Sequence, residues 1–250
     1  MGTEPCYGDV TTDQYKRPRE THDRVTLITG ANKGIGFATA GQLRDLGHIV
    51  YVGARDKRKG EEAAATLGAR FLHLDVTDDA SVTEALSTID AAHGRLDVLV
   101  NNAGIVENGT LDGPTALRVF DTNVVGIIRV TEAALPLLRR SANPTVVTVS
   151  SSAGSFWATN NPDRPEFDLG FPLYSASKAA ATMITVKYAR SQPSIKFNAV
   201  EPGFTATDMT AALGGGRSPA ESARIVVRLA TLPTDGPTGT LQDEFGHLNW

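Results

Sequence analysis

The sequence predicts a single α/β domain with a doubly wound (Rossmann-type), mostly parallel sheet that carries helices on both faces. Short, continuously apolar runs alternate with segments of helical length and period. Apolar runs without a polar alternation are typical of parallel strands that are buried on both faces. Strand and helix in alternation imply right-handed crossovers. The length of 250 residues also suits one hydrophobic core.

The expected elements follow one another in regular order. Strands are predicted at Val25–Thr29, Ile49–Gly53, Phe71–Leu74, Val98–Val100, Val146–Val149 and Ile195–Val200. Helices are predicted at about 35–46, 57–66, 79–92, 115–139 and 175–191. The run Ser218-Pro219-Ala220-Glu221 has the form of a capping box with a first-turn proline, so it predicts the start of another helix. Residues 238–250 are expected to add a last short strand.

The composition bounds the organisation and the class of protein. Residues 1–24 are polar and aperiodic, so we predict a flexible N-terminal extension, or alternatively a partner-binding or lid segment, before a catalytic domain at 25–250. A net charge of −4 argues against a general nucleic-acid binder. No apolar run approaches the roughly 18 residues of a membrane span. A single cysteine, Cys6, scattered histidines without metal-ligand spacing and no recognisable secretory signal indicate a cytoplasmic protein without a metal site.

A glycine-rich turn follows the first strand directly. Its sequence is Thr29-Gly30-Ala31-Asn32-Lys33-Gly34-Ile35-Gly36. At a strand-to-helix junction, glycines let the backbone approach a pyrophosphate, which then binds the free N–H groups of the helix N-terminus. This placement predicts a dinucleotide site rather than an ordinary turn.

The residues after the second strand favour NADP(H) over NAD(H). An acidic residue there would accept hydrogen bonds from the ribose 2′-hydroxyl and repel a 2′-phosphate. Here Arg55 comes first and the acid Asp56 follows it. Arg55 can bind a phosphate through two hydrogen bonds, and Lys33 in the glycine-rich turn adds a second positive charge.

Tyr174 and Lys178 are four residues apart at the start of a predicted helix, so their side chains share one helical face. An unperturbed tyrosine has a pKa near 10, which is high for acid–base exchange at neutral pH. A lysine ammonium one turn away is expected to lower the pKa of Tyr174. The pair therefore suits proton donation to a carbonyl group or removal of a proton from an alcohol.

Taken in order, these motifs resemble the short-chain dehydrogenase/reductase family over about residues 25–245. The shared pattern comprises the TGxxxGxG turn, Asp75-Val76, Asn101-Asn102-Ala103-Gly104, Asn123, Ser150-Ser151-Ser152, the Tyr174 and Lys178 pair, and Pro202-Gly203. The glycine-rich turn and Ala54-Arg55-Asp56 are also similar to the NADPH-dependent carbonyl reductase branch of that family.

The resemblance implies a role for each matching residue. Tyr174 would be the general acid/base, Lys178 would lower its pKa and hold the nicotinamide ribose, and Ser151 would hydrogen-bond the substrate oxygen, with Ser152 as the alternative. Asn123 would hold a water that links Lys178 to solvent, provided that the helix there is distorted. The implied cofactor-binding residues are Gly30, Asn32, Lys33, Gly34, Ile35, Gly36, Arg55, Asp75, Val76, Asn102, Ala103, Gly104, Tyr174, Lys178, Pro202, Gly203, Thr205 and Thr207.

Two segments near the substrate side depart from the common pattern. Ser151 and Tyr174 are 23 residues apart (174 − 151), which is longer than usual in the family. The added residues fall at about 155–172, and their aromatic side chains either wall an apolar substrate pocket or are buried in a surface flap. At about 205–219 the run Gly214-Gly215-Gly216 predicts the hinge of a lid, or alternatively an ordinary flexible loop.

The sequence therefore predicts an NADP(H)-dependent reductase of a ketone or aldehyde with a tyrosine as proton donor. The alternatives are an alcohol or hydroxysteroid-type dehydrogenase that uses the same site oxidatively, and a non-catalytic NADPH sensor. The expected partner is a small carbonyl or alcohol substrate of apolar or aromatic character. The expected state is a monomer or homodimer that binds neither nucleic acid nor membrane.

Overall fold

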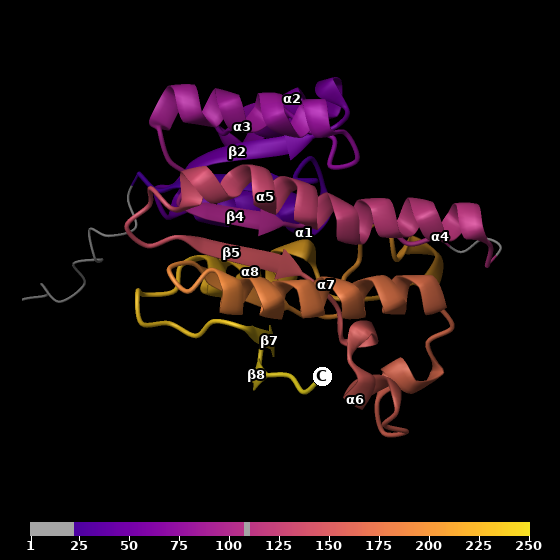
Figure 1. Cartoon of the computed structure of the whole chain (residues 1–250). Coiled ribbons are helices and arrows are strands. Elements are labelled where there is room, and N and C mark those ends of the chain that lie inside the picture. Colours follow the sequence, from indigo (N-terminus) through magenta and orange to yellow (C-terminus); the bar gives the residue numbers. More distant parts are fainter. Residues whose placement is uncertain (1–22, 108–110) are drawn as a thin grey trace, which may run out of the picture.

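The computed structural model describes residues 23–107 and 111–250. In these residues one sheet has the strand order β3-β2-β1-β4-β5-β6-β7-β8 (Figure 1). Neighbouring strands from β3 to β7 are parallel, and only β7 and β8 pair antiparallel. The strands are β1 (Val25–Thr29), β2 (Ile49–Ala54), β3 (Arg70–His73), β4 (Val98–Asn101), β5 (Thr145–Val149), β6 (Lys196–Val200), β7 (Thr240–Asp243) and β8 (Gly246–His247). The predicted fold class is confirmed.

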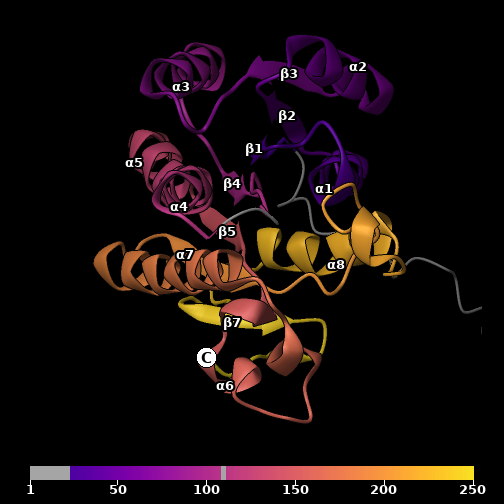
Figure 2. The same ribbon diagram turned by 90° about the vertical axis from the view of Figure 1, so that its right-hand side faces the viewer.

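Helices cover both faces of this sheet (Figure 2). One face is covered by α1 (Gly34–Asp45), α2 (Lys57–Leu67) and α8 (Pro219–Ala230). The other face is covered by α3 (Asp79–His93), α5 (Gly126–Leu138) and α7 (Pro172–Ser191). The helix α4 (Gly113–Phe120) continues the line of α5 beyond the sheet (Figure 1). In the part of the chain described here, no helix is long and apolar enough to cross a membrane.

The central strands are continuously apolar because successive residues enter opposite cores. Leu27 of β1 and Leu99 of β4 belong to the core beneath α3, α5 and α7. Ile28 and Val100, the next residue of each strand, belong to the core beneath α1, α2 and α8. All four side chains are fully buried. Two covered faces explain why these strands show no polar alternation.

The helix predicted at 115–139 is wrong as a single α-helix. It is interrupted by a π-helical segment at Asp121–Val125, which separates α4 from α5. A π-helical turn inserts one extra residue per turn without altering the apolar period on either side, so hydrophobic periodicity does not reveal it. The other predicted elements differ from the observed ones by only a few residues. The capping box at Ser218 and Glu221 is present at the start of α8.

The N-terminal boundary of the domain lies slightly earlier than predicted. Residues 1–22 of the expected extension lie outside the described residues, but Arg24 is buried at the base of the sheet. Its guanidinium donates to the carbonyl oxygens of Asp97, Asn143 and Ala230. Arg24 is therefore a structural residue of the domain.

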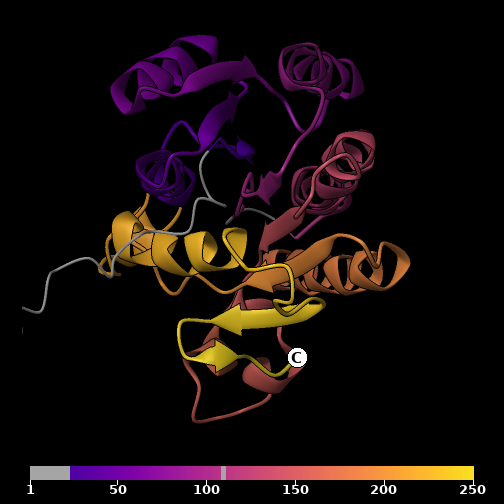
Figure 3. The same ribbon diagram turned by 90° about the vertical axis from the view of Figure 1, so that its left-hand side faces the viewer.

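The expected insertion at 155–172 lies beside the C-terminal residues of the chain (Figure 3). It contains α6 (Phe156–Thr159) and a 3-10 turn at Pro165–Asp168. The hydroxyl of Ser155 caps α6 and also donates to the carbonyl of Asn249 at 2.6 Å. The insertion is thereby attached to the segment that follows β8.

Candidate active site

The glycine-rich turn is shaped to leave the N-terminus of α1 open. Gly30 has a φ of +64° and Gly34 a φ of +59°, in the left-handed region that favours glycine. A Cβ atom at Gly36 would collide with the side-chain amide of Asn102, which donates to the carbonyls of Thr29 and Gly30 at 2.8 and 3.1 Å. Asn102 thus fixes the turn to the end of β4. This cradle fits a dinucleotide pyrophosphate.

Arg55 and Asp75 follow neighbouring strands, β2 and β3, at the same edge of the sheet. Arg55 is exposed, and the Asp75 carboxylate accepts hydrogen bonds from the N–H and hydroxyl of Thr77 at 2.9 and 2.7 Å. Burial acts to raise the pKa of Asp75, but these hydrogen bonds and the charge of Arg55 outweigh it and lower the pKa. The residues predicted for the adenosine end of a cofactor therefore lie together.

Lys33, the second predicted phosphate ligand, contacts the loop at 205–219. Its ammonium group lies 2.7 Å from a carboxylate oxygen of Asp208, and both side chains are largely exposed. Asp208 belongs to the expected lid, and Thr207 beside it lies next to Gly34 of the glycine-rich turn. The loop at 205–219 thus contacts the glycine-rich turn directly.

Asn123 lies in the π-helical segment with its side chain fully hydrogen-bonded. Its carbonyl oxygen accepts the N–H of Ile105 at 2.8 Å, and its amide donates to Ile105 O at 2.9 Å and to the Ser177 hydroxyl at 3.0 Å. These contacts join the π-helical segment to α7 and to the loop after β4. The helix distortion that the expected water-binding role required is present.

Tyr174 and Lys178 lie together in the first turns of α7. The Lys178 ammonium is 5.6 Å from the centre of the Tyr174 ring and donates to the carbonyl of Val149, at the end of β5, at 2.7 Å. A Cβ at Gly104 would lie 3.5 Å from this ammonium and 3.4 Å from the Asn123 carbonyl oxygen. The loop after β4 therefore passes close to both Lys178 and Asn123.

The predicted lowering of the Tyr174 pKa is not observed. Burial, followed by the charge of Glu201, raises the pKa of Tyr174 to about 12, and a hydrogen bond with Ser151 opposes this effect. Burial also lowers the pKa of Lys178 to about 8, although Glu201 opposes the change. Desolvation of the phenolate thus outweighs the favourable effect that was expected from a neighbouring ammonium group.

The three consecutive serines have different surroundings. Ser150 is buried, and its hydroxyl contacts the Lys178 carbonyl at 3.1 Å and the Thr182 hydroxyl at 2.7 Å. Ser152 is also buried, and its N–H donates to the carboxylate of Glu201. Ser151 is partly exposed, its hydroxyl accepts the N–H of Ala153 at 3.2 Å, and it lies close enough to Tyr174 to act to lower the pKa of that group. The geometry therefore favours Ser151 over Ser152 as the residue that meets a substrate oxygen.

Glu201 is the residue of this site that the sequence analysis missed. It follows the fully buried strand β6 and precedes Pro202-Gly203. A charged residue directly after a buried strand, at the edge of the sheet where ligands bind in α/β proteins, was the signal available in the sequence. In the structure its charge acts on both Tyr174 and Lys178.

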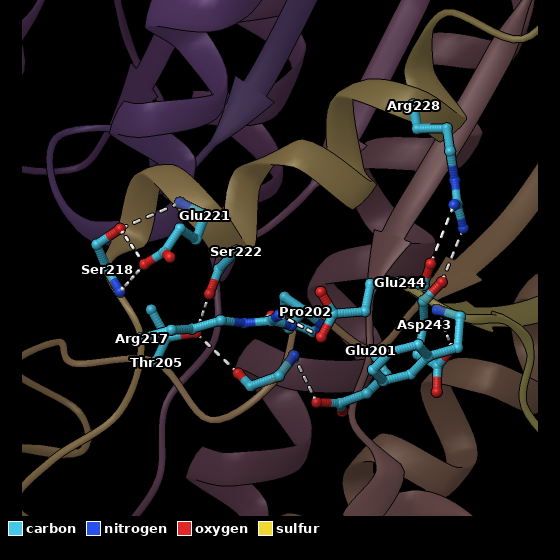
Figure 4. A network of polar contacts seen from close by, with 12 residues as sticks. Glu201, Pro202, Thr205, Arg217, Ser218, Glu221, Ser222, Arg228, Asp243 and Glu244 are labelled. Atoms are coloured by element: carbon cyan, nitrogen blue, oxygen red, sulfur yellow. Dashed lines mark hydrogen bonds and ion pairs between the residues drawn. The ribbon is translucent and has the colours of Figure 1, made fainter.

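The Pro202-Gly203 turn is held by residues of the expected lid and of α8 (Figure 4). The Arg217 guanidinium donates to the carbonyl of Pro202 at 2.9 Å and pairs with Glu244 at 2.7 Å. The buried Thr205 hydroxyl contacts Gly203 O at 2.8 Å and Ser222 Oγ at 2.5 Å. Thr205, predicted as a cofactor ligand, therefore has a structural role within this turn.

The segment at 205–219 is a loop closed at its base. The N–H of Ala206 donates to Arg217 O at 2.9 Å, and the N–H of Arg217 donates to Phe204 O at 3.0 Å. Gly214, Gly215 and Gly216 all have positive φ and lie inside this loop rather than at its ends. A hinge at the three glycines would move the tip of the loop but not its base.

The insertion presents aromatic rings at its surface. The side chains of Phe156 and Phe167 are 72% and 52% exposed. Trp157 lies under the Arg164 guanidinium at 5.4 Å, and Arg164 pairs with the buried Glu166 through two contacts of 3.0 Å. These exposures differ from the alternative expectation of a flap with buried rings.

A parallel sheet with an open helix N-terminus and a neighbouring Ser–Tyr–Lys set defines a dinucleotide-binding oxidoreductase of the α/β class. The profile of the short chain dehydrogenase family matches residues 24–217. The chain therefore belongs to this family, whose members bind a nicotinamide cofactor and act on alcohol or carbonyl groups.

Several characterised relatives resemble the chain over most of its length. It is 30% identical to the (+)-neomenthol dehydrogenase of Capsicum annuum, covering 88% of this chain and 96% of that protein. It is 32% identical to the (−)-isopiperitenone reductase of Mentha piperita, with 86% and 95% covered. The structure of salutaridine reductase from Papaver somniferum aligns with a TM-score of 0.76 at 29% identity and covers 87% and 99% of the two chains.

Proposed function

We propose that this protein is an NADPH-dependent reductase that converts a ketone or aldehyde to an alcohol, with Tyr174 as the proton donor. The observation that carries the proposal is the placement of Tyr174 with the Lys178 ammonium 5.6 Å from its ring centre and with Ser151 close enough to lower its pKa, at the edge of the sheet where the glycine-rich turn lies. This arrangement offers a proton and a second hydrogen bond to one substrate oxygen.

Each residue of the site has a separate role in the proposed reduction of a carbonyl group. A bound NADPH would supply hydride to the carbonyl carbon. Tyr174, with a pKa raised to about 12, stays protonated at neutral pH and donates its proton to the carbonyl oxygen. The Ser151 hydroxyl donates a hydrogen bond to the same oxygen as negative charge develops there. Lys178, held by Val149 O, then helps to return a proton to Tyr174 through water near the π-helical segment.

The protonation state of Tyr174 favours reduction over oxidation. Oxidation of an alcohol needs the phenolate as base, and a raised pKa makes the phenolate scarce at neutral pH. The oxidative reaction, which the name of the neomenthol dehydrogenase relative suggests, is then expected to need alkaline pH. A non-catalytic NADPH sensor remains the third candidate, and loss of the Tyr174 hydroxyl would not affect it.

The exposed aromatic rings of the insertion and of the residue before the loop at 205–219 suit an apolar substrate. The exposed rings of Phe156 and Phe167 belong to the insertion, and Phe204 at the base of the lid is half exposed. Apolar side chains at the rim of a site bind substrates with large hydrocarbon parts by removing both surfaces from water. The similar proteins are named for neomenthol, isopiperitenone and salutaridine, which supports a small organic molecule of this kind.

The test is NADPH oxidation at neutral pH with a panel of aliphatic, aromatic and steroidal ketones, with NADH run in parallel. The expected result is turnover with NADPH that the variant Tyr174→Phe loses by about 10²-fold or more, while its affinity for NADPH is unchanged. Tight NADPH binding without turnover of any ketone or alcohol, together with no effect of Tyr174→Phe, would instead support the sensor.

The preference for NADPH is proposed to depend on Arg55. The variant Arg55→Ala removes the exposed guanidinium after β2 and is expected to weaken NADPH binding about tenfold without changing NADH affinity. The control is Arg58→Ala, which removes an equally exposed arginine that pairs with Glu62 on α2. Equal losses for both cofactors in the Arg55 variant would contradict the assignment.

A further inference from the structure

Glu201 connects two loops of the site through one carboxylate. One oxygen accepts the N–H of Gly203 at 2.7 Å, and the other accepts the N–H of Ser152. The backbone of Glu201 is itself fixed, because its N–H donates to the carbonyl of Gln242 in β7 at 2.8 Å. Figure 4 shows Glu201 beside the Pro202 turn and the Arg217 side chain. Glu201 is therefore a rigid bridge between the loop after β5 and the turn after β6.

Both loops carry residues that the proposed reaction uses. Ser152 follows Ser151 directly, and the Ser151 hydroxyl accepts the N–H of Ala153 at 3.2 Å, so Glu201 fixes the backbone of the short loop that carries the Ser151 hydroxyl. Gly203 begins the segment that leads through Thr205 to Thr207, the residue next to Gly34 of the phosphate loop. The Glu201 side chain thus sets the position of Ser151, which would bind the substrate oxygen, relative to the segment from Gly203 to Thr207, which would approach the cofactor.

Charged groups surround Glu201 on several elements. From α7 it faces Tyr174 and Lys178, whose protonation it affects. From the insertion it faces Glu166, and the Ser152 hydroxyl lies within hydrogen-bonding reach of both carboxyl groups. Arg164, which pairs with Glu166, lies beyond these groups. The Arg217–Glu244 pair lies there too, against Pro202.

We propose that Glu201 is a positioning residue of the reaction, which holds the serine loop and the Pro202-Gly203 turn together and places a negative charge beside the Tyr174–Lys178 pair. This inference deepens the proposed function and rests on it. Burial raises the pKa of Glu201, and the two backbone N–H groups that donate to separate oxygens of its carboxyl group oppose this rise by favouring the ionised form. No neutral side chain of this length can accept both bonds equally well.

The sign of the charge effect follows from the surroundings. The negative charge of Glu201 disfavours the phenolate of Tyr174 and favours the ammonium of Lys178, so it raises the pKa of both groups. Removal of this charge is expected to lower both. In alcohol oxidation, where Tyr174 must lose its proton, the rise of activity with pH would then occur at lower pH.

The experiment compares two variants of Glu201 with the wild type and with Glu84→Gln, which removes one negative charge from an exposed position on α3 as a control. Glu201→Gln removes the charge at constant size. The pH at which alcohol-oxidation activity rises on the acid side of the pH profile is expected to fall by on the order of one unit. Glu201→Asp keeps the charge but is too short to reach both N–H groups. The activity of this variant should rise at the same pH as that of the wild type, while its kcat falls about tenfold. Glu84→Gln should change neither quantity.

A second readout is independent of turnover. Backbone hydrogen exchange of the segments around Ser152 and Gly203 should become faster in both Glu201 variants and stay unchanged in Glu84→Gln. The inference would be overturned if hydrogen exchange were unchanged in the Glu201 variants, or if the activity of Glu201→Gln rose at the same pH as that of the wild type. If the wild type turns over no carbonyl or alcohol, the proposed function fails instead, and the exchange measurement still decides whether Glu201 holds the two loops together.

Discussion

Lys33 of the glycine-rich turn and Asp208 of the loop at 205–219 form an ion pair with a separation of 2.7 Å between nitrogen and oxygen. Their side chains are 63% and 78% exposed, so water and salt screen the pair. Lys33 is also the residue that we propose for a cofactor phosphate. A bound 2′-phosphate would therefore compete with Asp208 for the same ammonium group.

The variant Asp208→Asn removes this competitor. It is expected to tighten NADPH binding about twofold to fivefold at low ionic strength, the range of an exposed ion pair, and to leave NADH binding unchanged. Fluorescence titration of the two cofactors measures the effect. Asp163→Asn, an exposed acid in the insertion, controls for the change in net charge. Weaker NADPH binding in Asp208→Asn would mean that Asp208 positions Lys33 instead of competing for it.

The choice between Ser151 and Ser152 can be tested with two alanine variants. Ser151→Ala removes the hydroxyl that contacts Tyr174, and kcat is expected to fall about 10²-fold with little change in stability. Ser152→Ala keeps the N–H that Glu201 binds, so kcat is expected to fall by less than about tenfold. Steady-state kinetics with one good ketone substrate decides between them. A larger loss in Ser152→Ala would reverse the assignment.

The sequence predicted the positions of the strands and helices of this molecule better than its electrostatics. Apolar periodicity and glycine spacing are local properties, so β1, α1 and the turn between them could be placed to within about one residue. The pKa of Tyr174 depends on burial and on Glu201, which is 27 residues away (201 − 174) and on another element. The pairing of Lys33 with Asp208 is also a contact between distant segments. Effects of this kind require the packed fold.

The π-helical segment at Asp121–Val125 is a second feature that could not be predicted from the residues of the segment itself. The need for a distorted helix around Asn123 followed from the family resemblance, yet no residue in the segment is a proline or glycine that would mark the distortion. The segment is instead held by the contacts of Asn123 with Ile105 and Ser177. Tertiary hydrogen bonds decided the local conformation here, and a one-dimensional pattern does not contain them.

His48 makes the stability of the fold sensitive to acid. The ring is buried, its Nδ1 lies 2.8 Å from the Thr26 hydroxyl, and its Nε2 has no partner among the described residues. Burial and then the charge of Arg24 lower the pKa of His48 from 6.5 to about 4. Between these pH values the unfolded chain binds a proton that the folded chain does not, so stability falls as the pH is lowered through this window.

The expected loss of unfolding free energy from His48 is on the order of 3 kcal/mol between about pH 6.5 and 4, because one pKa unit corresponds to about 1.4 kcal/mol. Urea denaturation at several pH values measures it. A variant without a titratable ring, His48→Gln, should lose stability less steeply over this range. His247→Gln, which changes an exposed histidine of β8, should keep the wild-type slope. Equal slopes in all three proteins would assign the acid sensitivity to other groups.

Gly154 determines how closely the loop of Ser150, Ser151 and Ser152 approaches α7. A Cβ at this position would lie 2.5 Å from the backbone nitrogen of Ala179 and 2.6 Å from the carbonyl carbon of Lys178. Both are backbone atoms in the middle of α7, which cannot move aside as a flexible side chain can. Gly154→Ala must therefore push the loop away from α7 and separate Ser151 from Tyr174.

The cost of this displacement appears in stability and in catalysis. Gly154→Ala is expected to lower the unfolding free energy by about 1–3 kcal/mol, the range for overpacking a close contact, and to lower kcat as well. The matched variant Gly113→Ala adds a methyl group at the start of α4, where a Cβ meets no atom of the described residues within 4 Å. Its stability should stay within about 0.5 kcal/mol of the wild type. If Gly154→Ala is as stable and as active as Gly113→Ala, the close packing of this loop on α7 does not set the geometry of the site.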